Sequence, residues 1–215
     1  MKPQVEVSHY FSESSHSKKL FISYWHQITE IRDLSPKRVL EIGIGNGFVS
    51  KFLKDRKLNV ITLDFDERLN PDVVGSVLDI PFPDNLFNVV ACYEVLEHMP
   101  YENFHIALSE IFRVSDSYVI LSFPDINRVC QFSIDILNVG HLIKLLIPLP
   151  RFKKAVHKFD GEHFWEIGKA EYPLNKIIKD IQVVGFKIKK TYRVFENPYH
   201  RFFILHKDVR LQQNY

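Results

Sequence analysis

Apolar residues follow two different spacings along the chain from residue 36 onward. Short apolar runs, typical of buried strands, occur at residues 38–42, 59–64, 73–77, 87–92, 117–123, 186–194 and 200–207. Apolar residues recur at helical spacing at residues 46–56, 101–113 and 173–183. The alternation of strands with helices predicts an α/β fold, in which helices cover both faces of a largely parallel sheet.

The last two predicted strands are connected differently from the others. The residues between them, Glu196-Asn197-Pro198, are a turn signal and are too few for a crossover helix, so these two strands should pair antiparallel. The sequence therefore predicts a C-terminal antiparallel hairpin on an otherwise parallel sheet.

A further amphipathic helix is predicted before the first strand, within residues 14–33. Its apolar positions share one helical stripe and are Leu20, Phe21, Tyr24, Trp25, Ile28 and Ile31. We expect this helix, in an N-terminal extension of residues 1–35, to pack on the domain.

Residues 124–170 form an insertion that a minimal α/β domain does not need. Its stretch 132–147 is strongly apolar, but Asp135, Gly140 and Lys144 interrupt it before the roughly 20 residues that a membrane-spanning helix requires, so we predict no span. A basic cluster follows, made of Arg151, Lys153, Lys154, His157 and Lys158. The cluster is either a solvated charged face or a patch for an anionic lipid or an acidic substrate.

Composition limits the alternatives. The 215 residues fit one domain with a full hydrophobic core, and a net charge of +2 is too balanced to indicate nucleic-acid binding by charge alone. The first eight residues contain no apolar run of the kind a signal peptide needs, so a cytoplasmic location is expected. We expect Cys92 and Cys130 to be reduced, since they form neither a disulfide framework nor a metal spacing.

The most informative motif lies at the end of the first predicted strand. Gly43, Gly45 and Gly47 let the backbone approach a ligand, and Asp64, about twenty residues on, closes the next apolar run where a carboxylate can bind ribose hydroxyls. Asp66 competes for that role. A dinucleotide site would carry a third glycine or an alanine at the position of Phe48, so the motif predicts a nucleoside other than a nicotinamide cofactor.

The Gly-x-Gly-x-Gly pattern, with Glu41 two residues before it, resembles motif I of the class I S-adenosylmethionine-dependent methyltransferases. The resemblance implies a Rossmann-like, doubly wound, mostly parallel seven-stranded sheet with a C-terminal antiparallel hairpin. It also implies S-adenosylmethionine as cofactor, S-adenosylhomocysteine as product, and Glu41 and the three glycines as cofactor-binding residues.

Three later segments resemble the same family in the same order. Residues 60–64 resemble the second strand with its ribose-binding Asp64, and residues 77–82 resemble the loop in which Asp79 and Ile80 hold the adenine. Residues 87–98 resemble the fourth strand and its following loop, where Glu94 would contact the methionine portion of the cofactor or the acceptor.

The C-terminal part narrows the resemblance to a subgroup. His163-Phe164-Trp165, the helix through Leu174, Ile177 and Ile178, and Gly185-Phe186 are similar to the methyltransferases of type 11 that include quinone-biosynthesis enzymes. The resemblance covers roughly residues 36–123 and 161–207, and it implies a single methyltransferase domain over residues 1–215. Helices that precede the core in this family often close over the cofactor, in which case Tyr10, His16 and Tyr24 would line the site.

Few catalytic residues are needed, because the methyl group of a sulfonium is already activated and the protein mainly orients donor and acceptor. His163, and after it His98, are the candidate bases, and each could instead be structural. We predict no metal site, because the nearby acids and histidines of residues 157–163 show no regular ligand repeat. Cys92-Tyr93-Glu94-Val95 also lacks the Asn or Asp-Pro-Pro-Tyr or Phe motif of enzymes that methylate base amino groups, which disfavours a nucleic-acid substrate.

The sequence thus predicts a methyltransferase that acts on a small, partly apolar acceptor at oxygen or carbon. The alternative is a catalytically silent methyltransferase-like subunit that binds the cofactor or a protein partner, and a nicotinamide dehydrogenase ranks third. The insertion could be a cap over the acceptor, a peripheral membrane contact or a homodimer interface.

Overall fold

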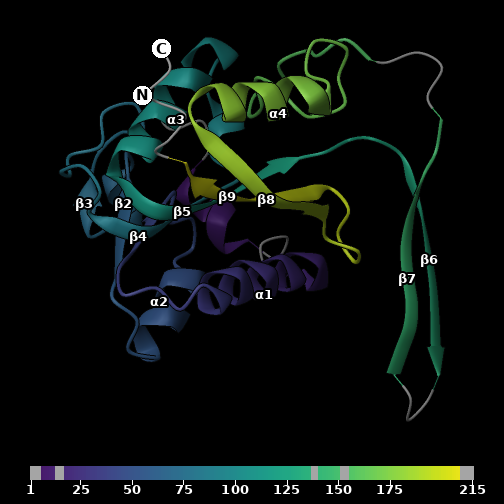
Figure 1. The fold of residues 1–215 in the computed structure, drawn as a ribbon, viewed down its shortest axis with the longest axis horizontal. Helices are drawn as coiled ribbons and strands as arrows, with labels where there is room; N and C mark the ends of the chain where they lie inside the picture. The colour runs from purple at the N-terminus through teal and green to yellow at the C-terminus, as the bar shows by residue number, and fades with distance from the viewer. Residues whose placement is uncertain (1–5, 13–16, 137–139, 151–154, 209–215) are drawn as a thin grey trace.

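The computed structural model describes residues 6–12, 17–136, 140–150 and 155–208. A seven-stranded sheet forms its centre, in the order β3-β2-β1-β4-β5-β9-β8 (Figure 1). The first five strands in this order pair parallel, and β9 is antiparallel to both of its neighbours. The strands are β1 (Val39–Ile42), β2 (Val60–Asp64), β3 (Val73–Val74), β4 (Phe87–Tyr93), β5 (Ser115–Pro124), β8 (Phe186–Arg193) and β9 (His200–Lys207). The predicted fold, including the C-terminal antiparallel hairpin, is confirmed.

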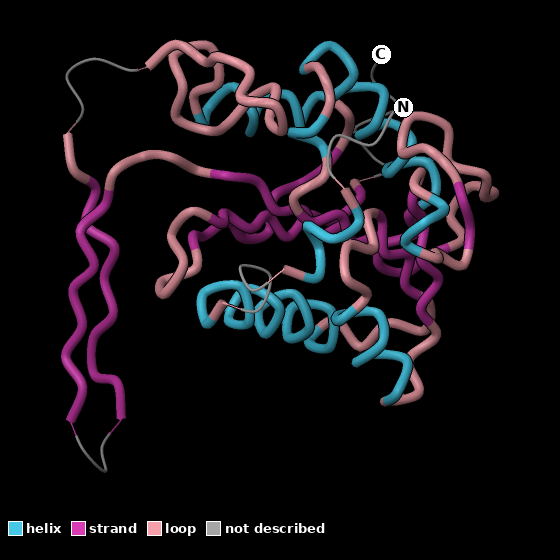
Figure 2. The backbone as a smooth tube through the Cα atoms, turned by 180° about the vertical axis from the view of Figure 1, so that it is seen from behind, coloured by secondary structure: helices cyan, strands magenta, loops and turns pink. Residues whose placement is uncertain are grey.

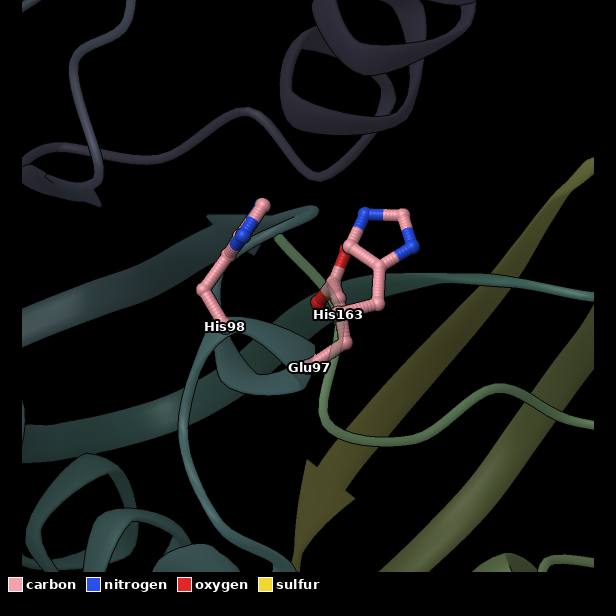
Figure 3. Close-up of side chains that lie close together, drawn as sticks. All are labelled: Glu97, His98 and His163. Atoms are coloured by element: carbon pink, nitrogen blue, oxygen red, sulfur yellow. The ribbon is translucent and has the colours of Figure 1, made fainter. Parts of the chain in front are cut away.

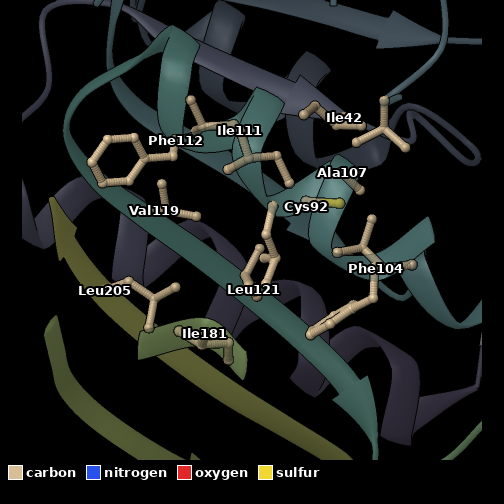
Figure 4. Packing of buried hydrophobic residues seen from close by; sticks show 14 of the residues in the cluster. Ile42, Cys92, Phe104, Ala107, Ile111, Phe112, Val119, Leu121, Ile181 and Leu205 are labelled. Atoms are coloured by element: carbon tan, nitrogen blue, oxygen red, sulfur yellow. The ribbon is translucent and has the colours of Figure 1, made fainter. Parts of the chain in front are cut away.

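Two pairs of helices cover the sheet, one pair on each face (Figures 1 and 2). They are α1 (Lys18–Asp33) with α2 (Phe48–Asp55), and α3 (Phe104–Val114) with α4 (Leu174–Val183). Short 3-10 turns lie at Val7–Phe11, Glu67–Leu69, Leu96–His98 and Tyr101–Asn103. Each helix pair buries a separate apolar cluster against the sheet. Figure 4 shows the larger cluster, where Phe104 and Ile111 of α3 pack on Leu121 of β5.

The element boundaries differ from the prediction where side chains or turns end a pattern. The expected strand 73–77 stops at Val74, because Ser76 closes a turn in which its hydroxyl accepts from the Leu78 N–H and its carbonyl from the Asp79 N–H. The helix expected from residue 46 begins at Phe48, because Gly47 caps it in the left-handed conformation with φ +71°. The N-terminal helix begins at Lys18, where the Ser17 hydroxyl accepts from the Leu20 N–H.

The insertion has two parts. Its apolar stretch forms an antiparallel ribbon of β6 (Val129–Ile136) and β7 (Gly140–Pro148), which projects from the body of the domain (Figure 1). Within the described ranges, no helix is long and apolar enough to cross a membrane. The second part returns to the sheet, where Ile167 forms a parallel bridge with Asp125 at the end of β5.

Trp165 fixes this returning segment to the core. Its side chain is fully buried, its indole N–H donates to the Leu96 carbonyl at 3.1 Å, and its ring packs on Phe104 and Phe123 at centroid distances of 5.2 Å. The Phe164 N–H also donates to the Glu97 carbonyl at 2.8 Å. The returning segment is therefore part of the folded core, whereas the ribbon lies outside it.

Trp165→Ala should lower the free energy of unfolding by about 3–5 kcal/mol, the usual loss for a fully buried aromatic side chain. Trp25→Ala is the matched control, because Trp25 is 61% exposed on α1 and its loss should change stability by less than about 0.5 kcal/mol. Urea unfolding followed by far-ultraviolet circular dichroism measures both. Equal losses in the two variants would contradict the anchoring role of Trp165.

Candidate functional site

A cavity of about 550 Å³ opens at the carboxyl ends of β1, β2 and β4. Ligands of open α/β sheets gather at this edge. Its walls also include Tyr10 and Tyr24 from the N-terminal segment, residues 162–164 of the insertion, and Tyr199 and His200 at the start of β9. Tyr10 and Tyr24 therefore lie where the sequence placed them, while His16 falls outside the described residues. None of the described ribbon residues, within 129–136 and 140–148, lines the cavity.

The glycine turn after β1 forms one wall. Gly43 has φ +81°, and a Cβ atom there would lie 2.3 Å from Cγ2 of Val95, so only glycine fits. Gly45 also lines the cavity, whereas Gly47 serves to start α2. Asn46 connects this wall to the N-terminal helix, since its amide donates to the Tyr24 hydroxyl at 3.0 Å. The sequence reasoning did not single out Asn46.

Two acids on the neighbouring strand ends are held differently. The Asp64 carboxylate is 8% exposed and accepts from the N–H groups of Ile44 and Asp66 at 3.0 and 2.9 Å. Burial raises the pKa of Asp64. Asp66, its competitor, instead binds the Arg68 guanidinium through both oxygens, and this hydrogen bonding lowers the pKa of Asp66. Asp64 is therefore the better-oriented acceptor for a ligand hydroxyl.

Glu41 lies below the glycine turn and is 4% exposed. Burial raises its pKa to about 8, and one carboxylate oxygen has no hydrogen-bond partner within the described part of the chain. An uncharged Glu41 at neutral pH would become ionised if a cation bound beside it.

The structure places Asp79 and Ile80 away from the cavity lining, so their role in binding adenine stays a prediction. Neither residue lines the cavity: Asp79 is exposed, and Ile80 is 2% exposed in the core. The Ile80 N–H donates to Glu110 at 2.8 Å, and its carbonyl accepts from Arg113 at 2.8 Å, so both main-chain groups are engaged away from the cavity. Val77 is the residue of this loop that reaches the wall.

The part of the cavity formed by the end of β4, the returning segment and the start of β9 carries acids and histidines. Glu94, at the end of β4, has φ +51°, and one of its carboxylate oxygens lies 3.8 Å from Nε2 of His200. Glu97 is fully buried, and neither of its carboxylate oxygens has a hydrogen-bond partner among the described residues. Burial and the nearby Glu94 hold the pKa of Glu97 well above its usual range, which favours the protonated, uncharged form of this carboxyl.

The two candidate bases stand next to each other. The rings of His98 and His163 are 4.9 Å apart between centroids (Figure 3). His98 Nδ1 lies 3.0 Å from the Glu162 carbonyl, so Nδ1 carries the proton of a neutral ring. Burial and the neighbouring His163 lower the pKa of His98.

His163 has a carboxylate partner. Its Nδ1 lies 3.5 Å from Glu166, whose other contacts include the Tyr199 hydroxyl at 2.7 Å. Burial alone would lower the pKa of His163, but Glu166, Asp160 and Glu94 together raise it, and the same pairing lowers the pKa of Glu166 to about 2. A carboxylate on one ring nitrogen orients the other as an acid or base. Glu166, Tyr199 and His200 lack any pattern in the sequence that would have identified them.

Glu97, His98 and His163 could also hold a metal ion, since one donor atom from each lies within 4.8 Å of the others (Figure 3). The residues that the sequence analysis weighed for a metal are used otherwise: Asp160 accepts from the N–H groups of Glu162 and His163, and His157 Nε2 lies 2.9 Å from the His163 carbonyl. These contacts shape the loop. The prediction of no metal stays a prediction.

The charged side chains that line the cavity are mostly acidic. Its lining includes five acids, Glu41, Asp64, Asp66, Glu94 and Glu162. Among the described residues that line it, none is Lys or Arg. Such a cavity favours a cationic ligand over an anionic one.

Comparison with known proteins agrees with this geometry. A family model for a methyltransferase domain matches residues 40–121. An uncharacterised protein of Methanocaldococcus jannaschii is 29% identical over 168 residues, which is 72% of each chain.

Two solved structures share the fold. The magnesium protoporphyrin IX methyltransferase from Synechocystis PCC 6803, with bound S-adenosylhomocysteine, matches 97% of this chain and 90% of its own, with a TM-score of 0.56 and 16% identity. An S-adenosylmethionine-dependent methyltransferase from Listeria monocytogenes, assigned by similarity, matches 86% of this chain and 98% of its own, with a TM-score of 0.55 and 18% identity. The motif, the sheet order and the matching family model agree: residues 40–121 match a methyltransferase domain, and the chain shares the fold of these two methyltransferases.

Proposed function

We propose that the chain binds S-adenosylmethionine and transfers its methyl group to a small, partly apolar acceptor at oxygen or carbon. The observation that carries the cofactor assignment is the acid-rich cavity without Lys or Arg in its described lining. The sulfonium of this cofactor is a cation, and opposite charges attract strongly in a partly desolvated site. The pyrophosphate of a nicotinamide cofactor would be repelled by the same carboxylates. The product bound in the cyanobacterial structure of the same fold supports the assignment.

The cavity residues fit this cofactor from two sides. The main chain at Gly43 and Gly45 permits close approach, and Asp64 is oriented to accept from ribose hydroxyls. Glu41 supplies a buried carboxyl that the cofactor's positive charge would ionise. When bound, the cofactor supplies an activated methyl group on sulfur.

The acids and histidines near the end of β4 and on the returning segment fit the acceptor. His163, oriented by Glu166, would take the proton of an acceptor hydroxyl as the bond from methyl carbon to sulfur breaks and the bond to oxygen forms. The leaving sulfur keeps the bonding electron pair and becomes a neutral thioether. Met99, Pro100 and Phe164 line the same region and give the pocket apolar walls.

A silent binding subunit is the competing function, and turnover separates the two. Pools of small hydroxylated and activated-carbon compounds should be screened for production of S-adenosylhomocysteine, with heat-treated protein as the blank. The screen should be run with Mn²⁺ and with a chelator, because Glu97, His98 and His163 could hold a divalent ion. Cofactor binding without turnover on any pool would favour the silent subunit.

Asp64→Ala should weaken cofactor binding by about 1–3 kcal/mol, the usual loss for a hydrogen bond to a charged group. Asp79→Ala is the matched control: Asp79 is exposed and does not line the cavity, so its removal should leave affinity unchanged. Isothermal titration calorimetry measures both. Reduced affinity in Asp79→Ala would instead support the adenine role that the resemblance implies for this residue.

Affinity for S-adenosylmethionine should rise with pH relative to that of Glu41→Gln. The pKa of Glu41 in the free protein is about 8, so below this pH the carboxyl must lose its proton when the cation binds, and the free energy of deprotonation weakens binding. Above this pH the carboxyl is already ionised, and binding no longer includes that free energy. The gain is up to about tenfold for each unit by which the ligand lowers this pKa. Calorimetry at pH 6.5 and 8.5 on both proteins cancels titration of the ligand itself. If the ratio of the two proteins' affinities were the same at both pH values, Glu41 would not interact electrostatically with the bound cofactor.

His163→Ala should lower turnover by about 100- to 10,000-fold and leave cofactor affinity intact, since a general base acts only in the chemical step. Glu166 raises the pKa of His163, and the base must be deprotonated, so turnover should fall as pH drops through that pKa. Glu166→Gln should move this fall to lower pH. Pre-steady-state rates against pH test both. Full turnover in both His163→Ala and His98→Ala would show that positioning alone suffices.

A further inference from the structure

The β6–β7 ribbon presents an apolar face to solvent. Phe132 pairs with Leu145 and Ile134 with Ile143, and paired residues of antiparallel strands share one face. Ile147, paired with Cys130, extends the same face toward the base of the ribbon. These five apolar side chains are between 39% and 50% exposed. A contiguous exposed apolar face of this kind marks an interaction surface.

The opposite face of the ribbon is turned toward the domain. The Gln131 amide donates to the Phe195 carbonyl, and Nζ of Lys144 lies 2.6 Å from Glu196 and over the Phe195 ring. These contacts with the β8–β9 turn hold the polar face inward. The apolar face therefore points away from the domain.

The base of the ribbon is anchored by buried charges. The Asp125 carboxylate is fully buried and accepts from Arg201 at 2.6 Å. Arg193 donates to the carbonyls of Asp125 and Asn127 at 2.8 Å. The direction in which the apolar face points is thus fixed by the fold.

The surroundings of this face are basic. A second cavity, of about 380 Å³, lies at the base of the ribbon and is lined by Arg128, Arg193 and Arg201 beside Val129, Leu146 and Leu149. Residues 128–158 contain six Lys or Arg and a single acid, Asp135, although the whole chain has a net charge of only +2. The exposed apolar face therefore sits in a basic stretch of the chain.

We propose that the ribbon docks on the surface of a membrane that contains anionic lipids. An apolar face with flanking basic residues binds where acyl chains meet charged headgroups. The ribbon lies in that interface and does not cross it, because its two strand edges carry N–H and C=O groups that hydrocarbon cannot satisfy. This docking extends beyond the proposed methyl transfer and does not depend on it.

A second copy of the chain is the rival occupant, and charge argues against it. A two-fold dimer places the same patch of each subunit against the other, so two basic surroundings would meet. The apolar face also consists of aliphatic residues and one Phe, without the Tyr, Trp or Arg that enrich the centres of protein interfaces.

Co-sedimentation with vesicles tests the proposal. The full chain should bind vesicles of phosphatidylcholine with 30% phosphatidylglycerol, an anionic content chosen at about one lipid in three, and should bind pure phosphatidylcholine at least about tenfold more weakly. Phe132→Ser combined with Leu145→Ser should reduce binding about tenfold or more. Exchanging the exposed Arg128 and Lys158 for Ser should reduce it by roughly 30-fold, at about 1 kcal/mol for each charge, and high salt should also weaken it.

Val183→Ser is the matched control, since Val183 is a 66% exposed apolar residue at the end of α4 and its change should leave vesicle binding intact. Calorimetry with S-adenosylhomocysteine shows that each variant is folded, because the ribbon does not line the main cavity. If the variant with Phe132→Ser and Leu145→Ser does not fold, the variant that lacks the basic side chains still tests the proposal. The proposal would be overturned if the chain bound no vesicles, or if it bound both vesicle types equally. It would also be overturned if the chain were a dimer that Phe132→Ser combined with Leu145→Ser converts to a monomer unable to bind vesicles.

Discussion

The burial of Trp165 is the contact on which the geometry of the site depends. The insertion leaves the sheet at the end of β5 and returns where the N–H of Ile167 donates to the Pro124 carbonyl at 2.9 Å. Trp165, two residues earlier, is inserted among aromatic rings from α3 and β5. His163 is only two residues further back, so its ring is placed against His98 by the core rather than by a free loop. A site that needs sub-ångström placement is best supported in this way, by residues locked by packing.

The second constraint is electrostatic. Burying the carboxyls of Glu41 and Glu97 would be very costly if both were ionised, and burial raises the pKa of both groups, which favours their uncharged forms. The proton on Glu41 can leave when a cation takes its place, which couples binding to protonation. Glu97 lies beside His98 and His163, where a proton or a metal ion would compensate its charge. The cavity is therefore prepared for positive charge on both sides before any ligand arrives.

The sequence was sufficient for features that local chemistry determines. Strands such as β1 and β4 are buried along nearly their whole length, so continuous apolar runs marked them, and the positive φ of Gly43 follows from the glycine itself. The sequence could not show that Glu110 and Arg113, thirty or more residues later in the chain, bind the main chain of Ile80. Glu97 was visible in the sequence, but its burial depends on the returning segment. Tyr199 and Glu166 meet only through the tertiary fold.

The two parts of the insertion, the ribbon and the returning segment, contact the domain in different ways. Residues 162–167 are bound to β5 and to the turn after β4 through main-chain hydrogen bonds and a buried indole, and they form a wall of the cavity. The ribbon touches the domain through the β8–β9 turn and through Asp125 and its arginines, and it leaves its apolar face uncovered in the described structure. Of the described parts of the insertion, the returning segment and not the ribbon lies against the cavity. Tyr199 contacts Glu166 at the cavity wall and follows the turn that Lys144 binds, so residues 195–199 connect the ribbon to that wall.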